Sequence, residues 1–157
     1  MTTINLNTTD CPCGSGADYH TCCEPLHLNV RRADSPEQLM RSRYSAFYFE
    51  QFQYLINTHH PQYLGTLTVD DFGGEAQPKW LSLTVMSASD TMTTGKVTFQ
   101  AWFKDAEKID AIHECSDFIK EDNIWYYTQG VQYAPILPKR NAPCVCGSNK
   151  KFKQCCL

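Results

Sequence analysis

Polar and apolar residues between Ser35 and Leu55 repeat with the period of an α-helix. The segment begins Ser35-Pro36-Glu37-Gln38, which combines a capping serine, a proline at the first helical position and a glutamine three residues after the cap. Apolar residues then recur at steps of three and four residues: Met40, Tyr44, Phe47, Tyr48, Phe52 and Leu55. This spacing predicts one amphipathic helix of about twenty residues. We expect it to end at the His59-His60-Pro61 segment.

Beyond residue 78 the period changes to two, which is the period of a β-strand. The apolar positions that alternate with mostly polar ones are Leu81, Leu83, Val85, Val97, Phe99, Ala101 and Phe103. Two further runs span residues 109–120 and 124–133, and turn-forming residues lie at 90–95, 105–108 and 121–123. Four strands joined by short turns predict an antiparallel meander. The preceding helix must cover one face of it, so we expect an α+β fold with a curved four-stranded sheet.

Four charged or titratable residues of the helical region allow a structural and a functional interpretation. We expect Arg41 and Arg43 to lie on a solvated helix face with their stems along apolar surface. The alternative is an arginine that reaches into a pocket. We expect His59 and His60 to be cap or surface residues rather than metal ligands.

The bulk composition is that of a globular chain with small appendages. Its 157 residues are 42% hydrophobic and 12% aromatic. No apolar run approaches the roughly 18 residues needed to cross a membrane. Residues 1–10 contain no basic residue and no apolar block, which argues against a secretory signal. We therefore expect a cytoplasmic protein, a setting in which thiols bind metal rather than oxidise.

Eight of the nine cysteines belong to two copies of one thirteen-residue pattern. The N-terminal motif spans residues 11–23 and the C-terminal motif spans residues 144–156. Both read C-x-C-G-S-x3-aromatic-x2-C-C, and the aromatic residue is Tyr19 or Phe152. Glycine and asparagine tolerate positive φ, so the segment after the second cysteine is predicted to turn tightly. About one helical turn then returns the last two cysteines to the first two.

Four thiols in a short segment favour a tetrahedral zinc ion. A disulfide framework is the main alternative, but a bond between neighbours such as Cys22 and Cys23 is disfavoured because adjacent Cα atoms lie only about 3.8 Å apart. An iron–sulfur centre is a second alternative. Zinc sites with four cysteines are closed, whereas catalytic zinc keeps an open position. We therefore predict two structural sites and no catalytic residue in either motif.

Both segments resemble the SEC-C motif, which is named from the C-terminal tail of the preprotein translocase ATPase SecA. The resemblance implies zinc on two sets of ligands: Cys11, Cys13, Cys22 and Cys23, and Cys144, Cys146, Cys155 and Cys156. The C-terminal motif departs from the usual pattern at Asn149, where glycine is common, and the N-terminal motif has Ala17-Asp18 where lysines are common.

Charge distinguishes the two motifs. The chain carries a formal net charge of −3, yet from residue 139 onward it has five basic side chains and no acidic one. In SEC-C tails such a basic surface implies contact with the export chaperone SecB or with ribosomes. We predict that the C-terminal motif docks onto a protein partner of this kind through Lys150, Lys151, Phe152 and Lys153.

The middle of the chain resembles the cone fold of nuclear transport factor 2-like proteins, by its last hairpin, residues 109–130. Together with the segment Met40-Arg41-Ser42-Arg43-Tyr44-Ser45-Ala46 and the flanking SEC-C motifs, nearly the whole chain resembles the bacterial YchJ family, for which we know no established activity. The resemblance predicts an N-terminal motif at residues 1–28, a cone domain at 29–138 and a C-terminal motif at 139–157.

Three functions are open. The first is a zinc-binding protein that docks through its C-terminal motif, and we expect the two motifs to lie close enough to form one composite surface. The second is an enzyme or small-molecule binder that uses the cone interior. Its candidate residues, His113, Cys115 and Asp117, share one strand face, but we expect them on the solvent side or in satisfied structural roles. The third, nucleic-acid binding by the lysines and Phe152, is disfavoured by the acidic net charge.

Overall fold

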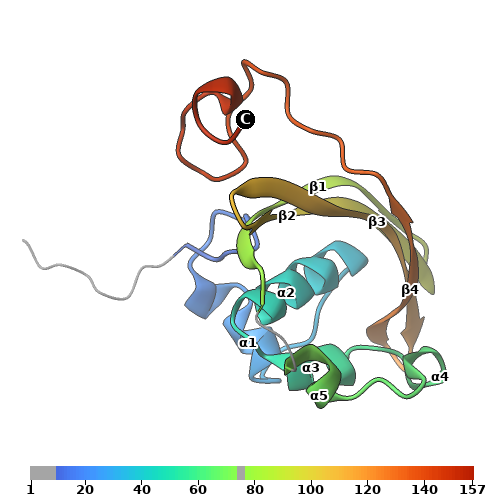
Figure 1. Ribbon diagram of the computed structural model, residues 1–157. Helices are drawn as coiled ribbons and strands as arrows, with labels where there is room; N and C mark the ends of the chain where they lie inside the picture. The colour runs from blue at the N-terminus through green and yellow to red at the C-terminus, as the bar shows by residue number, and fades with distance from the viewer. Residues whose placement is uncertain (1–9, 74–76) are drawn as a thin grey trace, which may run out of the picture.

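The computed structural model describes residues 10–73 and 77–157, and it has the predicted α+β architecture (Figure 1). The strands are β1 (Lys79–Asp90), β2 (Thr94–Asp105), β3 (Lys108–Glu121) and β4 (Ile124–Tyr133). They pair antiparallel in the order β1-β2-β3-β4, which confirms the predicted meander. Ala106, Asp122 and Asn123 adopt positive φ in the two tight turns, at the places where the sequence predicted them.

Five short α-helices and two 3₁₀ turns complete the described part of the chain. They are η1 (Tyr19–Thr21), α1 (Glu24–His27), α2 (Pro36–Tyr48), α3 (Phe52–Asn57), α4 (Pro61–Leu64), α5 (Val69–Gly73) and η2 (Phe152–Gln154). The α-helices lie on the concave side of the curved sheet (Figure 1). No helix of residues 10–73 and 77–157 is long and apolar enough to cross a membrane.

The single long helix that the sequence predicted is in fact two helices, α2 and α3. The start was right, because the Ser35 hydroxyl accepts a hydrogen bond from the Gln38 N–H at 3.1 Å. Glu50 breaks the helix with a φ of 56°. The N–H of Gln51 reaches back to Ala46 O at 2.7 Å, the hydrogen bond that defines a Schellman cap. Apolar spacing continues across this cap because α3 turns its own apolar face to the same core.

Helix α2 provides most of the contact between the helices and the sheet. Leu39, Met40 and Tyr44 are buried on its inner face. They form one core cluster with residues of all four strands: Leu83, Val97, Phe99, Ala101, Phe118 and Trp125. Burial of each large apolar side chain contributes about 1.5–3 kcal/mol to folding. The core therefore fixes α2 across the sheet.

The two cysteine motifs meet the same edge strand, β1, on opposite sides. The N-terminal motif lies beside α2, on the helical side of the sheet, and an extended segment carries the C-terminal motif to the convex side (Figure 1). Leu83 packs in the core, and Gly14 approaches its backbone oxygen. The neighbouring Ser82 hydroxyl donates a hydrogen bond of 2.5 Å to Val145 O. The two motifs therefore approach neighbouring residues of β1 from opposite faces of the sheet.

Candidate metal centres

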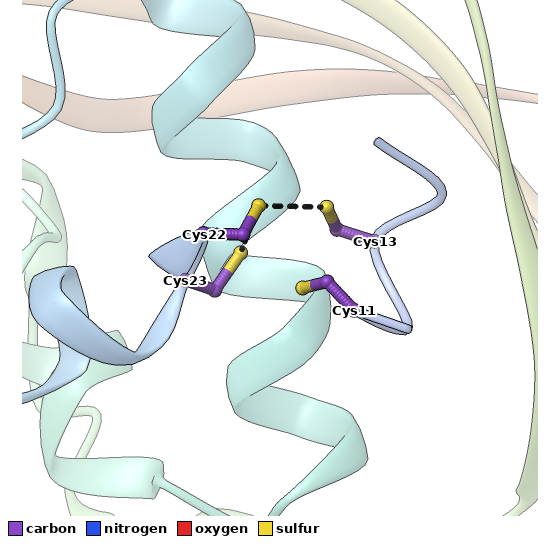
Figure 2. A group of neighbouring side chains, drawn as sticks. All are labelled: Cys11, Cys13, Cys22 and Cys23. Atoms are coloured by element: carbon purple, nitrogen blue, oxygen red, sulfur yellow. Dashed lines mark hydrogen bonds between the residues drawn. The ribbon is translucent and has the colours of Figure 1, made fainter. Parts of the chain in front are cut away.

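Each motif brings its four cysteine sulfurs together. Within each group the sulfur atoms all lie within 4.8 Å of one another. Cys13 Sγ lies 3.7 Å from Cys22 Sγ, which lies 3.8 Å from Cys23 Sγ (Figure 2). A tetrahedral ion with Zn–S bonds of ~2.3 Å needs sulfurs about 3.8 Å apart. All nine cysteines lie in the described residues and none forms a disulfide. The donor set and its spacing therefore fit one tetrahedral metal ion per motif.

The two motifs have the same backbone structure. Cys11 N–H donates to Ala17 O, and Cys144 N–H donates to Lys150 O, each at 2.8 Å. Gly14 and Gly147 have φ values of 80° and 81°, as the predicted tight turn requires. Two residues further on, Gly16 and Asn149 both take positive φ. Asparagine therefore replaces glycine without a change of backbone.

A serine hydroxyl contacts one sulfur in each motif, a role that sequence analysis did not assign. Ser15 Oγ lies 3.1 Å from Cys22 Sγ, and Ser148 Oγ lies 3.3 Å from Cys155 Sγ. Each hydroxyl oxygen also accepts a backbone N–H two residues on, at 3.2 Å. Its proton is therefore free to point to the sulfur and to stabilise a thiolate. The shared Cys-Gly-Ser sequence was the available signal for this role.

The N-terminal cluster is buried against helix α2. Cys13 and Cys23 are 0% and 1% exposed. The fully buried Ser45 of α2 lies 3.5 Å from Cys11 Sγ and donates to Cys23 Sγ at 3.4 Å. Arg41 of the same helix donates to Cys13 O at 2.6 Å. The helix thus supplies a hydroxyl to the sulfurs and a positive charge beside them, which offsets part of the negative charge of four thiolates.

A half-buried hydrogen-bond chain connects the motif's aromatic residue, Tyr19, to the same helix. The Nε2 of His27 lies 2.8 Å from Ser42 O, which only accepts, so Nε2 carries the proton. Nδ1 therefore accepts from the Tyr19 hydroxyl at 2.7 Å. Burial lowers the pKa of His27, in agreement with a neutral ring. Tyr19 packs against the cysteine cluster.

The C-terminal cluster is much more open. Cys155 is exposed, and Cys146 and Cys156 are half-buried. The pKa of Cys146 is lowered to about 6, mainly by a hydrogen bond from the Ser148 hydroxyl, and this favours the thiolate form of Cys146. Lys150, Lys151 and Lys153 are all exposed.

Phe152 was predicted to contact a partner, and this part of the prediction is wrong. The side chain is 3% exposed because it forms the small apolar centre of the C-terminal motif. A buried ring cannot serve as a stacking platform, which further weakens the nucleic-acid hypothesis. The accessible part of the predicted surface consists of the lysines.

The two histidines before α4 have the expected structural roles. His60 caps α4 by accepting the Gln62 N–H at 3.2 Å, and its Nε2 lies 2.6 Å from a Glu121 oxygen. His59 Nε2 donates to Thr128 O at 3.0 Å. Neither side chain belongs to a cysteine group.

His113, Cys115 and Asp117 share one face of β3, as the alternation in the sequence predicted. Asp117 pairs with Lys96 at 2.6 Å on the outer face of the sheet. His113 Nδ1 donates to Ala134 O at 2.9 Å. Cys115 is half-buried and belongs to neither cysteine group. His113 and Asp117 therefore have the structural partners that the sequence analysis expected.

Arg43 contradicts the expectation of a solvated helix face. Its Nη1 donates to Leu55 O at 2.9 Å and to Thr58 Oγ1 at 2.6 Å. The guanidinium lies 4.6 Å from the centre of the Tyr127 ring. The polar periodicity was misleading because Arg43 faces the space between α2, α3 and β4 rather than solvent. The alternative interpretation, an arginine that reaches into a pocket, is correct for Arg43.

Comparison with known proteins agrees with this architecture. Residues 9–25 and 140–157 match the SEC-C motif, and residues 35–130 match the family described as YchJ, middle NTF2-like domain. A UPF0225 protein of Shewanella sp. (strain MR-4) is 51% identical over 94% of this chain and 96% of its own. A UPF0225 protein of Vibrio cholerae serotype O1 (strain M66-2) is 40% identical over 93% of this chain and 98% of its own.

Two solved structures share the fold. The solution structure of a SEC-C motif containing protein from Rhodopseudomonas palustris has a TM-score of 0.73 and 35% sequence identity, and it covers 78% of this chain and 98% of its own. The crystal structure of a SEC-C motif containing protein from Psychrobacter arcticus has a TM-score of 0.69 and 29% identity, with 96% of each chain covered.

The fold and its two cysteine groups define an NTF2-like domain flanked by SEC-C motifs. The extent of the family match and of the similarity to the UPF0225 proteins places the chain in the YchJ family. The three resemblances found in the sequence, to the SEC-C motif, the nuclear transport factor 2-like fold and the YchJ family, are confirmed.

Proposed function

We propose that the protein binds one zinc ion in each SEC-C motif and docks onto a protein partner through the C-terminal motif. Four thiolates in a tetrahedral arrangement are ligands for zinc or a single iron. Sulfurs within 4.8 Å of one another suit one ion better than a multi-iron cluster, whose cysteines bind different iron atoms. Zinc is the common choice for closed four-cysteine sites, and it would act structurally here.

The observation that supports docking is the difference in charge and exposure between the motifs. Five basic side chains of the C-terminal segment are exposed: Lys139, Arg140, Lys150, Lys151 and Lys153. Within residues 10–73 and 77–157, no carboxylate lies within 4.0 Å of any of them. Basic side chains without internal partners are available to an acidic protein surface, and they would make the association salt-dependent.

The SEC-C motif suggests the class of partner. In SEC-C tails, a basic surface of this kind implies contact with an export chaperone of the SecB type or with the ribosome. Either partner would meet the lysines through carboxylates or phosphates, while the buried Phe152 keeps the motif folded. Because a metal would hold the lysine-bearing turn in shape, docking should require the metal-loaded protein.

The test is affinity capture with the triple variant Lys150→Glu, Lys151→Glu, Lys153→Glu, followed by identification of the bound proteins. The matched control reverses three basic residues away from the C-terminal motif: Arg32→Glu, Lys96→Glu and Lys120→Glu. The proposal predicts that a partner is lost with the first variant and kept with the control. Equal partner sets for both variants, at equal zinc content, would contradict docking. Absence of zinc from the purified protein would contradict the metal assignment.

A further inference from the structure

The concave side of the sheet encloses a cavity that has no part in metal binding. It has a volume of about 320 Å³ and lies between α2, α5 and the four strands. Small-molecule sites of proteins have volumes from about 300 Å³ upward. None of the eight cysteines of the SEC-C motifs lines it. The cavity is therefore a candidate ligand site independent of the docking surface.

One end of the cavity is aromatic. Phe47 of α2 packs against Phe72 of α5 and Trp80 of β1, with ring centres 5.6 and 6.1 Å apart. Tyr44 lies one helical turn away on α2 and packs edge-on against Trp80 at 5.8 Å. These four side chains line the cavity and suit an apolar, preferably planar, ligand body.

Two buried polar groups at this end have no partner. In the described residues, the side-chain N or O atoms that are buried without a hydrogen bond are Tyr44 Oη, Trp80 Nε1 and Trp125 Nε1. The first two belong to residues that line the cavity, and such groups are rare in folded proteins. Tyr44 Oη and Trp80 Nε1 are therefore free donors at the aromatic end of the cavity, within the part of the chain that the structure describes.

The opposite end of the cavity is polar, because the strand register places polar residues there. Glu114 of β3 pairs with Gln132 of β4, and both line the cavity. Arg43 and His59 approach from the helical side. A ligand that fits this space is thus amphipathic, with its polar group near β3 and β4.

Arg43 offers a carboxylate-binding edge at the polar end. Its Nη1 is occupied by Leu55 O and Thr58 Oγ1. The Nε and Nη2 atoms, whose parallel N–H groups bind carboxylates bidentately, have no hydrogen-bond partner among residues 10–73 and 77–157. Burial lowers the pKa of Arg43 to about 10, so the guanidinium stays charged at neutral pH. A half-buried cation without an anionic partner is costly, and an anionic ligand would reduce that cost.

Glu114 does not serve as that partner. No described carboxylate lies within 4.0 Å of Arg43. Glu114 accepts the Ser116 hydroxyl at 2.6 Å and lies over Gly130, where an added Cβ would be 2.4 Å from its carboxyl carbon. The missing side chain at Gly130 thus leaves room for the carboxylate on the sheet. In this position it is an acceptor for a hydroxyl or ammonium group of a ligand.

We infer that the cavity binds a small organic monocarboxylate with an aromatic or branched apolar body, such as an aryl-substituted hydroxy acid. The carboxylate pairs with the open edge of Arg43, the body lies among Phe47, Phe72 and Trp80, and a hydroxyl or ammonium group donates to Glu114. A doubly charged phosphate fits less well, because one guanidinium beside a carboxylate and apolar walls cannot balance its charge.

The direct test is NMR titration of the 157-residue chain with phenylacetate, 3-phenylpropionate and 3-phenyllactate. Phenylacetamide is the neutral control and inorganic phosphate is the anion control. We expect saturable shifts centred on residues of the cavity such as Ile112 and Tyr127, with 3-phenyllactate binding more tightly than 3-phenylpropionate. No saturable shift with any carboxylate, or equal binding of phenylacetamide and phenylacetate, would overturn the inference.

The variants Arg43→Gln and Arg43→Lys identify the binding group. The loss of a charged hydrogen bond should weaken carboxylate binding roughly 10- to 100-fold in Arg43→Gln, and Arg43→Lys should recover part of it. Arg32→Gln, which removes an exposed charge, is the matched control and should bind as the parent does. Unchanged affinity in folded Arg43→Gln overturns the assignment. If Arg43→Gln fails to fold, the chemical-shift changes of the parent protein test the inference: shifts centred on residues of the cavity support it, and their absence overturns it.

Discussion

In the N-terminal motif Cys13 is fully buried, whereas its equivalent in the C-terminal motif, Cys146, is half-buried and Cys155 is exposed. Backbone hydrogen bonds, positive-φ turns and serine–sulfur contacts are the same in both motifs. The local sequence therefore determines the cysteine cluster, and the surroundings determine its burial. Two copies of one motif differ because only the first lies against a helix.

The contacts explain the difference. The N-terminal motif receives Arg41 and Ser45 from α2 and reaches Ser42 through His27. Within residues 10–73 and 77–157, the C-terminal motif has one side-chain hydrogen bond to the domain, from Ser82 to Val145 O. A metal ion in the first motif would stabilise the domain core, whereas one in the second would stabilise mainly the motif itself.

The largest expected effect comes from removing one ligand in each motif. Cys13→Ser should lower the free energy of unfolding by about 4 kcal/mol or more, because loss of a metal is among the few single changes of that size. Cys146→Ser should leave the melting of the cone domain near that of the parent. Thermal unfolding followed by near-ultraviolet circular dichroism measures both, and equal destabilisation would remove the distinction between the motifs.

A smaller effect is expected from the hydroxyls that contact sulfur. Ser45→Ala removes a fully buried donor to Cys23 and should cost about 1–3 kcal/mol. Ser148→Ala removes an exposed one that water replaces, and it should cost less than about 0.5 kcal/mol. Denaturant titration of the parent and the two variants measures the loss in the free energy of unfolding for each. A larger loss in Ser148→Ala than in Ser45→Ala would contradict the account.

The smallest effect concerns pH. Burial lowers the pKa of His27, so the unfolded chain takes up this proton at a higher pH than the folded one. The neutral His27 ring therefore contributes to the free energy of unfolding above about pH 6.5, the pKa of histidine in the unfolded chain. This contribution is lost as the pH falls from there through the lower pKa of His27 in the folded chain. His27→Gln should therefore lose less stability than the parent between pH 7 and 5. Parallel stability curves for the two proteins would show that His27 does not contribute.

Sequence reasoning worked where a local pattern determines the structure. Alternation predicted the four strands, and the glycine after the second cysteine predicted the turn that Gly14 and Gly147 form. The Ser35 cap was also predictable, because its partner is three residues away.

The failures involve contacts between distant segments. The lysines around Phe152 suggested an exposed aromatic residue, yet the folded motif buries its side chain. The helical pattern suggested a solvent-exposed position for Arg43. The cap at Glu50 instead turns α3 back, so that the Arg43 guanidinium donates a hydrogen bond to Leu55 O. Burial of the N-terminal cysteines likewise depends on α2, which lies more than a dozen residues away in the sequence.

We propose that the two motifs hold metal ions of unequal accessibility. Native mass spectrometry during a timed exposure to a chelator tests it directly, with Cys146→Ser used to assign the steps. We expect two zinc ions per chain, the first released quickly from the C-terminal motif and the second slowly from the N-terminal motif. Release of both ions at one rate, or prior release from the N-terminal motif, would contradict it.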